Sequence, residues 1–333
     1  LAARTAEHFG TEHHPVIMSG RDVAASFEDI VWHMDEPVSN HIQPATFFLA
    51  KFAKPEIAVA LGGDGGDELF GGYDRYWYSA WLDRIRLLPT PLRHRVLLCL
   101  AGRLTGRASF LEKVALPPGV DRFLSFMQQK EERVAAFLRA DANHPEVIRE
   151  TFIPFFEDPW KDATNQWMAA DVQTWLSDES LTRTDKLTMA HGLEERVPFL
   201  DPRLVEFAFR VPSKWKLDRR TLGKKILRDA LADVLPSFVV KEKKRGFFSP
   251  AAKWLRGDLQ PFIREVLSDG YLDGDDVIDL PAVRQMLEDH IAKRRYGLNS
   301  LWAIMTWRVW RRKFGSPLQN SHSSSRATAR SVA

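Results

Sequence analysis

Apolar residues recur at intervals of three and four along several segments, which is the spacing of a buried helix face. This spacing predicts a helix over residues 22–33, with Phe27, Ile30 and Val31 on its apolar face. It also predicts a closing helix in the segment SLWAIMTWRVWRRKFG, residues 300–315. The apolar positions of that closing helix are Leu301, Ile304, Met305 and Val309.

Two short apolar runs have the composition of strands. Residues 57–61 (IAVAL) are apolar and partly β-branched, which is typical of a buried parallel strand, and residues 13–18 (HHPVIM) predict another strand. Helices and strands then alternate along the first part of the chain. We therefore expect an α/β fold, with a parallel sheet flanked by helices.

Three more helices are expected from local signals. One covers the amino terminus and is closed by Gly10, one starts at Pro44, and one runs from a cap at Asp178 or Ser180 to about Gly192. Residues 77–161 have helical spacing with a break at 117–119, and we interpret them as a helical insertion. Residues 316–333 contain no acidic residue and no Phe, Tyr or Trp, which predicts a disordered tail.

Composition and charge exclude several classes of protein. The chain has 47 basic and 44 acidic residues, so its net charge of +3 gives no bulk electrostatic reason to expect a nucleic-acid partner. Cys99 is the only cysteine, which excludes an intramolecular disulfide and favours a reducing compartment. No apolar run reaches the roughly 20 residues that span a bilayer, and no signal-peptide pattern is present. We expect a cytoplasmic protein without a membrane partner; its first residue, Leu1, suggests a fragment or a processed chain.

The candidate chemistry lies directly after the predicted strand at 57–61. Residues 62–72 contain six glycines and three carboxylates, Asp64, Asp67 and Glu68. Open α/β sheets bind ligands at the carboxyl ends of their strands. Carboxylates in such a loop can hold Mg²⁺, which usually bridges to substrate phosphates, and glycines let phosphate come close. A surface turn or a calcium loop would be the alternative, but the EF-hand spacing does not fit.

Three ordered blocks of sequence resemble one family. The loop LGGDGGDELFGGY, residues 61–73, is similar to the signature loop of the synthetase domain of glutamine-dependent asparagine synthetases. The segment LSDESLTRTDKLTMAHGLEERVPFLD, residues 176–201, is similar to a second family block. GKKILRDAL (223–231) and KKRGFFSPAAKWLRG (243–257) together resemble a third. The resemblance covers residues 1–315, implies one synthetase domain over that range, and implies the adenine nucleotide α-hydrolase-like fold of the ATP-pyrophosphatase group.

The resemblance implies an ATP-dependent synthetase that forms amides. A substrate carboxylate, foremost that of aspartate, would attack the α-phosphate of ATP to give an acyl-adenylate and Mg²⁺-pyrophosphate. Ammonia derived from glutamine would then displace AMP and, with aspartate, give asparagine. The implied cofactors are ATP and Mg²⁺, and a homodimer is expected.

The resemblance also implies roles for individual residues. Asp67 corresponds to the metal and pyrophosphate residue, and Asp64 to the carboxylate near the reacting centre. Gly62, Gly63 and Gly65 correspond to the nucleotide-binding backbone. Lys224 corresponds to a lysine that contacts the phosphates. Glu194 is a third candidate catalytic residue, although a buried Glu194–Arg196 pair that orders its loop is an open alternative.

The chain departs from the family pattern at several places. The nucleotide loop Ser-Gly-Gly-x-Asp-Ser is not found, since the nearest string, 18–22, lacks the second glycine and is interpreted as unrelated. That loop, its strand and the glutaminase domain would lie upstream of Leu1. Lys186 replaces an arginine and loses its bidentate geometry. Gly62 stands where serine is frequent, and residues 38–44 lack the usual acidic continuation, so a different carboxylate acceptor is possible.

Three alternatives therefore accompany the asparagine synthetase interpretation. One is an amidotransferase of the same family that acts on another carboxylate, an amino-sugar or a peptide. Another is a catalytically silent partner without the nucleotide loop. The last is a tRNA-thiolating enzyme of the same nucleotide-binding group, which the single Cys99 argues against.

Overall fold

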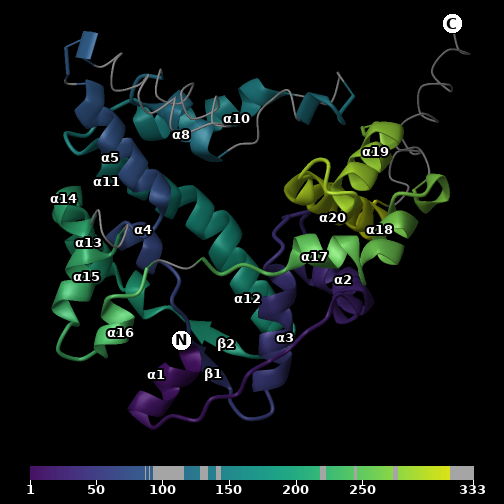
Figure 1. Ribbon diagram of the computed structural model, residues 1–333, viewed down its shortest axis with the longest axis horizontal. Helices are drawn as coiled ribbons and strands as arrows, with labels where there is room; N and C mark the ends of the chain where they lie inside the picture. Colours follow the sequence, from purple (N-terminus) through teal and green to yellow (C-terminus); the bar gives the residue numbers. More distant parts are fainter. Residues whose placement is uncertain are drawn as a thin grey trace, which may run out of the picture. The chain divides into compact units, whose positions relative to one another are not determined.

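The computed structural model describes residues 1–86, 88, 89, 91, 92, 116–127, 134–139, 144–217, 223–243, 246–272 and 277–315. Helices dominate these residues, and the sheet has two strands (Figure 1). The chain divides into two compact units. Unit 1 comprises Leu1–Ile17 and Leu49–Phe247, and unit 2 comprises Met18–Phe48 and Phe248–Ala333. Cys99 and the predicted tail at 316–333 lie outside the described residues.

The sheet of unit 1 pairs β1 (Val59–Leu61) in parallel with β2 (Glu194–Arg196). The predicted parallel strand is thus confirmed, but its predicted burial is wrong, because the Leu61 side chain is 75% exposed. Val59, two residues earlier and on the same face of the strand, is also exposed, so this face of β1 is left uncovered. The strand expected at 13–18 is also wrong: this segment has no regular structure, and Ile17 is 93% exposed.

The helices of unit 1 confirm the amino-terminal prediction and extend through the middle of the chain. α1 (Ala2–Phe9) is followed by Gly10, which takes the left-handed conformation (φ 62°) expected of a helix cap. In the described residues, unit 1 also contains α4 (Gly66–Phe70), α5 (Asp74–Arg86), α8 (Val120–Met127), α10 (Pro145–Phe152), α11 (Ala163–Asp171), α12 (Thr182–Met189), α13 (Pro202–Arg210), α14 (Ser213–Lys216), α15 (Lys225–Ala230) and α16 (Ser237–Val240). Short 3₁₀ turns cover Ile153–Phe156 and Pro198–Leu200.

One continuous helical run leads from the core of unit 1 to its sheet. The run consists of α11, a π-helical segment at Val172–Leu181, and α12. The prediction that a helix begins at Asp178 or Ser180 is therefore wrong. The run begins instead after Asp162, whose carboxylate accepts a hydrogen bond from the Asn165 backbone N–H at 3.1 Å.

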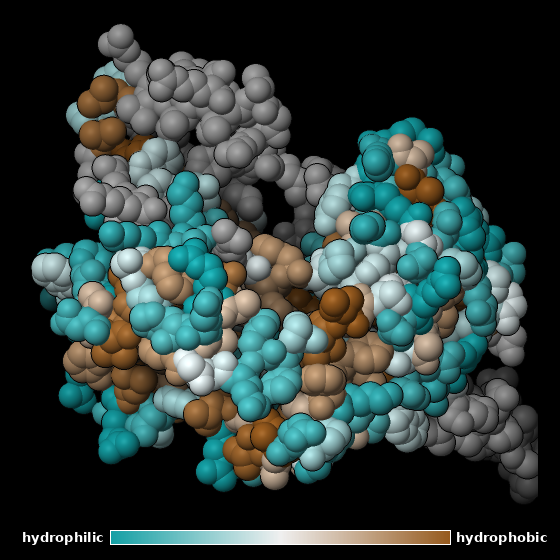
Figure 2. Space-filling view, turned by 60° about the horizontal axis from the view of Figure 1, so that its bottom comes forward, coloured by the Kyte–Doolittle hydropathy of each residue, from teal (hydrophilic) through white to brown (hydrophobic). Residues whose placement is uncertain are grey.

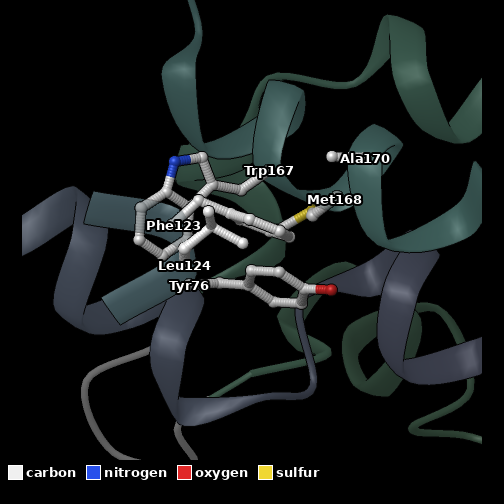
Figure 3. Close-up of a cluster of buried hydrophobic side chains, with 6 residues drawn as sticks. All are labelled: Tyr76, Phe123, Leu124, Trp167, Met168 and Ala170. Carbon is white, nitrogen blue, oxygen red and sulfur yellow. The ribbon is translucent and has the colours of Figure 1, made fainter. Parts of the chain in front are cut away.

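The core of unit 1 anchors this run. Trp167, Met168 and Ala170 of α11 pack against Tyr76 of α5 and the aromatic ring of Phe123 in α8 (Figure 3). The Tyr76 hydroxyl points out of the cluster and donates a hydrogen bond to the fully buried Asp171 carboxylate. Residues 120–127 of the predicted insertion thus belong to the packing that holds α11.

Unit 2 confirms the two amphipathic helices expected from residue spacing. α2 (Gly20–Met34) buries Phe27, Ile30 and Val31, and α20 (Leu298–Phe314) buries its predicted apolar positions. The unit also contains α17 (Ala251–Arg256), α18 (Gln260–Val266), a 3₁₀ turn (Asp269–Tyr271) and α19 (Leu280–Ile291). α3 (Gln43–Ala53), expected from Pro44, straddles the boundary between the two units.

The string at 18–22 caps a helix. Ser19 and Asp22 form a reciprocal capping box at the start of α2, in which the Ser19 backbone N–H donates to the Asp22 carboxylate at 2.8 Å. This local role agrees with the interpretation that the string is unrelated to a nucleotide loop.

Apolar side chains also reach the surface, where they form brown areas among polar teal ones (Figure 2). Ile17, Leu61 and Phe248 are strongly exposed examples. None of the helices in the described ranges is both long enough and apolar enough to cross a bilayer.

Candidate functional site

The glycine-rich loop continues directly from β1, as predicted. The Gly62 backbone N–H donates to the Arg196 carbonyl at 2.8 Å and extends the pairing of β1 with β2. Gly65 then takes a positive φ of 83° and precedes the short helix α4. Gly71 ends that helix with a φ of 70°. Both caps of α4 thus take a left-handed backbone, which glycine adopts without steric cost.

Asp64 lies at the end of a hydrogen-bond chain that comes from the π-helical segment. The Ser180 hydroxyl donates to Asp64 Oδ1 at 2.6 Å and accepts from Arg183 Nη2 at 3.0 Å. Arg183 is buried and forms an ion pair with Glu179 at 2.9 Å. Asp64 is thus tied to the second sequence block, 116 residues further along the chain.

Glu195, which sequence reasoning did not select, is the carboxyl group that lies against Asp64. Burial and the neighbouring Asp64 carboxylate raise the pKa of Glu195 to about 7, while the charge of Arg183 opposes that rise. A Cβ atom added to Gly62 would overlap the Glu195 Oε1 atom and lie 2.7 Å from its Cδ. The strand register alone could have indicated this contact, because Glu195 pairs with Ala60 in the neighbouring strand.

Glu194 points away from this group. Its carboxylate forms an ion pair with Arg196 at 2.8 Å, and the two side chains are 54% and 65% exposed. The Glu194–Arg196 pair considered from the sequence therefore exists, but it is exposed rather than buried. The catalytic role of Glu194 stays a prediction.

Asp67 and Lys224 meet on the other side of the loop. The Lys224 ammonium lies 3.1 Å from the Asp67 carboxylate, and the Lys224 backbone N–H donates to the Phe70 carbonyl at 3.0 Å. Lys224 is the N-cap of α15 and has an unusual positive φ of 54°. A cation near a helix amino terminus opposes the helix dipole, and the Asp67 anion relieves that conflict.

Gly223 makes this approach possible. Its φ is 145°, and an added Cβ would overlap the Gly71 carbonyl oxygen. Two backbone segments that are far apart in sequence therefore touch beside the site. The positive φ of Lys224, a residue with a side chain, is strained; such strain persists only where the surrounding structure over-determines it, and it is often found at functional sites.

A buried network fixes the helix that carries Asp67. Tyr73 donates to the Glu68 carboxylate at 2.7 Å, and burial raises the pKa of Glu68. Arg75 donates to the Asp171 carboxylate at 2.9 Å. Glu68, the third carboxylate of the loop, is therefore used in packing, whereas Asp64 and Asp67 stay partly accessible.

The acidic loop fits a metal that is shared with a substrate. No group of three or more His, Cys, Asp or Glu side chains suited to a metal forms among the residues in the described ranges. Mg²⁺ commonly binds through one or two carboxylates together with substrate phosphates, so it needs no such cage. Asp67, partly exposed beside a lysine, fits that mode of binding.

Comparisons with known proteins identify the family of this chain. The family model described as "Asparagine synthase" matches residues 1–312. Asparagine synthetase [glutamine-hydrolyzing] 1 of Bacillus subtilis is 31% identical over 93% of this chain and 49% of its own length. A putative asparagine synthetase [glutamine-hydrolyzing] of Mycobacterium tuberculosis is 33% identical over 93% of this chain and 48% of its own length.

A relative with a different name also matches. Amidase chyE of Penicillium rubens is 25% identical over 95% of this chain and 51% of its own length. The chain thus spans about half the length of the relatives that it matches. Because the family model covers nearly the whole sequence, the chain belongs to the asparagine synthase family.

Proposed function

We propose that this chain carries the synthetase part of an ATP-dependent, amide-forming ligase. The observation that carries the proposal is the Asp67–Lys224 ion pair, whose carboxylate belongs to the same glycine-rich stretch after β1 as Asp64. A carboxylate, a lysine and a glycine-rich turn at a strand end are suited to the phosphates of a nucleotide. The family membership supports the same chemistry.

In the proposed reaction, a substrate carboxylate oxygen attacks the α-phosphorus of ATP, and pyrophosphate leaves. Ammonia then attacks the acyl carbon of the adenylate, loses a proton, and AMP leaves. Lys224 would stabilise the negative charge that develops on the departing pyrophosphate. Mg²⁺, held by Asp67 and the phosphates, would supply further positive charge. The backbone at Gly62, Gly63 and Gly65 would line the nucleotide.

Aspartate is the proposed acceptor and asparagine the proposed product. Glutamine is the proposed source of the ammonia, through a glutaminase domain in the complete protein. The names of the Bacillus and Mycobacterium relatives support this choice. A cytoplasmic location and a homodimer complete the proposal, together with a single synthetase domain over 1–315 and a disordered tail.

Pyrophosphate release from ATP tests the proposal. The complete gene product would be assayed with Mg²⁺ and ammonium, first with aspartate and then with a panel of other carboxylates. Release that depends on aspartate, with asparagine formed, is the expected result. If no carboxylate gives release, the chain is a silent partner and the proposed activity is wrong.

A different acceptor is the second candidate, and the region of Gly62 favours it. Serine is frequent at this position in the resembled family, whereas here Gly62 leaves room for the Glu195 carboxyl beside Asp64. The amidase of Penicillium rubens also matches this chain over most of its length. Pyrophosphate release with another carboxylate but not with aspartate would support the proposed mechanism but would mean that asparagine is not the product.

A further inference from the structure

The Glu195 carboxyl occupies space that exists only because residue 62 is glycine. The register of the two strands pairs Ala60 with Glu195, and the Gly62 backbone N–H bonds to the next residue of β2. From there the Glu195 side chain folds back over the Gly62 Cα. A Cβ at position 62 would lie 2.7 Å from the Glu195 Cδ and 3.1 Å from its Cγ, so any larger residue displaces the carboxyl group.

The same carboxyl group lies within hydrogen-bonding reach of Asp64. Two carboxyl groups can form a hydrogen bond only if one of them carries a proton. Glu195 is the group whose neutral form is favoured, because it is half-buried and faces an anion. The charged groups that face it are Asp64 and Arg183. In its neutral form, Glu195 can donate a hydrogen bond to Asp64, to which the Ser180 hydroxyl also donates at 2.6 Å.

We propose that Gly62 and Glu195 act as a pair that positions the Asp64 carboxylate for the reaction. Glu195 is a positioning residue, since it acts through Asp64 and through no other group of the site. With both donors in place, the Asp64 side chain is held in one orientation. Without Glu195, Ser180 is the one hydrogen-bond donor to Asp64 that remains among the residues that the structure describes. The expected effect on catalysis rests on the proposed function. The expected effect on the orientation of Asp64 does not depend on that function.

A double-mutant cycle tests the pair. The variants are Gly62→Ala, Glu195→Ala and their combination, measured by thermal unfolding and by ATP–pyrophosphate exchange in the complete gene product. Gly62→Ala is expected to lower the melting temperature by about 2–4 °C in the wild-type background and by less than about 1 °C beside Glu195→Ala, because neighbours that clash are not additive. Gly270→Ala is the matched control, since a Cβ there meets nothing within 4 Å.

The exchange assay separates positioning from simple packing. Glu195→Ala is expected to lower kcat about tenfold while the KM for ATP changes less than about twofold. Glu195→Gln keeps the shape and a hydrogen-bond donor, so it should recover most of the loss seen with alanine. Equal kcat losses for alanine and glutamine, or additive melting temperatures in the cycle, would overturn the proposal.

Crystal structures keep the proposal testable if the wild-type protein shows no exchange at all. That outcome would contradict the proposed function but not the pairing. In Glu195→Ala, the Asp64 side chain is expected to take more than one orientation about its hydrogen bond to Ser180, and in Glu195→Gln it should keep the single orientation of the wild type. An Asp64 side chain that keeps its place in Glu195→Ala would show that Glu195 does not position it.

Discussion

Lys224 holds its ammonium 3.1 Å from the Asp67 carboxylate while its own backbone takes a left-handed conformation. The two residues are partly exposed, so the ion pair alone contributes only about 0–1 kcal/mol to stability. The ion pair contributes too little stability to account for the strained backbone of Lys224. That strain is well explained if the pair binds phosphate and metal.

Lys224→Ala is therefore expected to reduce activity far more than stability. We expect a loss of about 100-fold in ATP–pyrophosphate exchange, because a positive charge is removed where negative charge develops. The melting temperature should change by less than about 3 °C. Lys225→Ala is the matched control, since that lysine pairs with Asp229 at the surface of α15. Parallel losses of activity and stability would assign Lys224 a structural role.

Asp67→Asn is expected to abolish exchange at every Mg²⁺ concentration while the protein stays folded. The amide keeps the size of the side chain but removes the charge that binds a cation. Glu206→Gln, on the exposed face of α13, is a control for the loss of one carboxylate. Exchange that persists in Asp67→Asn would remove Asp67 from the predicted metal site.

Gly223→Ala is expected to destabilise unit 1 by about 2–4 kcal/mol, because the added methyl group overlaps a backbone carbonyl and φ is positive. Urea unfolding measures this loss. Gly119→Ala separates the two causes, since Gly119 has a positive φ of 130° but open space around its Cβ position. Similar losses in the two variants would mean that strain alone acts, and that Gly223 is not needed for close packing against Gly71.

The raised pKa of Glu195 predicts a dependence of stability on pH. Burial and Asp64 raise this pKa from 4.5 to about 7, so between these values the folded protein holds a proton that the unfolded chain has lost. Stability should therefore fall as the pH rises from about 4.5 to 7, and then level off. Because Glu195 is only half-buried, we expect an effect of about 1 kcal/mol.

Glu195→Gln removes this titrating group and therefore isolates its contribution to the pH dependence of stability. The difference in unfolding free energy between wild type and variant should change between pH 5 and 8. A difference that stays constant over this range would mean that Glu195 titrates normally in the folded protein.

The sequence predicted those parts of the fold that depend on local patterns. The amphipathic helices around Phe27 and Leu301 have regular spacing, and the loop after Leu61 has the glycines that a tight turn requires. The exposure of β1 was not predictable in this way, because burial depends on neighbours that lie elsewhere in the chain. The run HHPVIM has the composition of a strand but pairs with neither strand of the sheet.

The site was predicted where its residues lie in one motif and missed where it depends on contacts between motifs. Asp64, Asp67 and Lys224 were selected, and the structure joins the last two directly. Glu195 was passed over for its neighbour Glu194, because adjacent residues in a strand point to opposite faces and only the pairing with β1 decides which one faces Asp64. The Ser180–Arg183 chain likewise depends on the π-helical segment.

The π-helical segment at Val172–Leu181 makes the length of this part of the chain as important as its chemistry. A π-helical turn holds more residues than an α-helical one, and such segments often occur at functional sites. Deleting one residue would therefore remove the wide turns that place Ser180 next to Asp64 and would change which residues of the segment face the loop. Ser180 and Arg183 would then leave Asp64 although no side chain of the site had changed. During evolution, this segment should tolerate substitutions more readily than insertions or deletions.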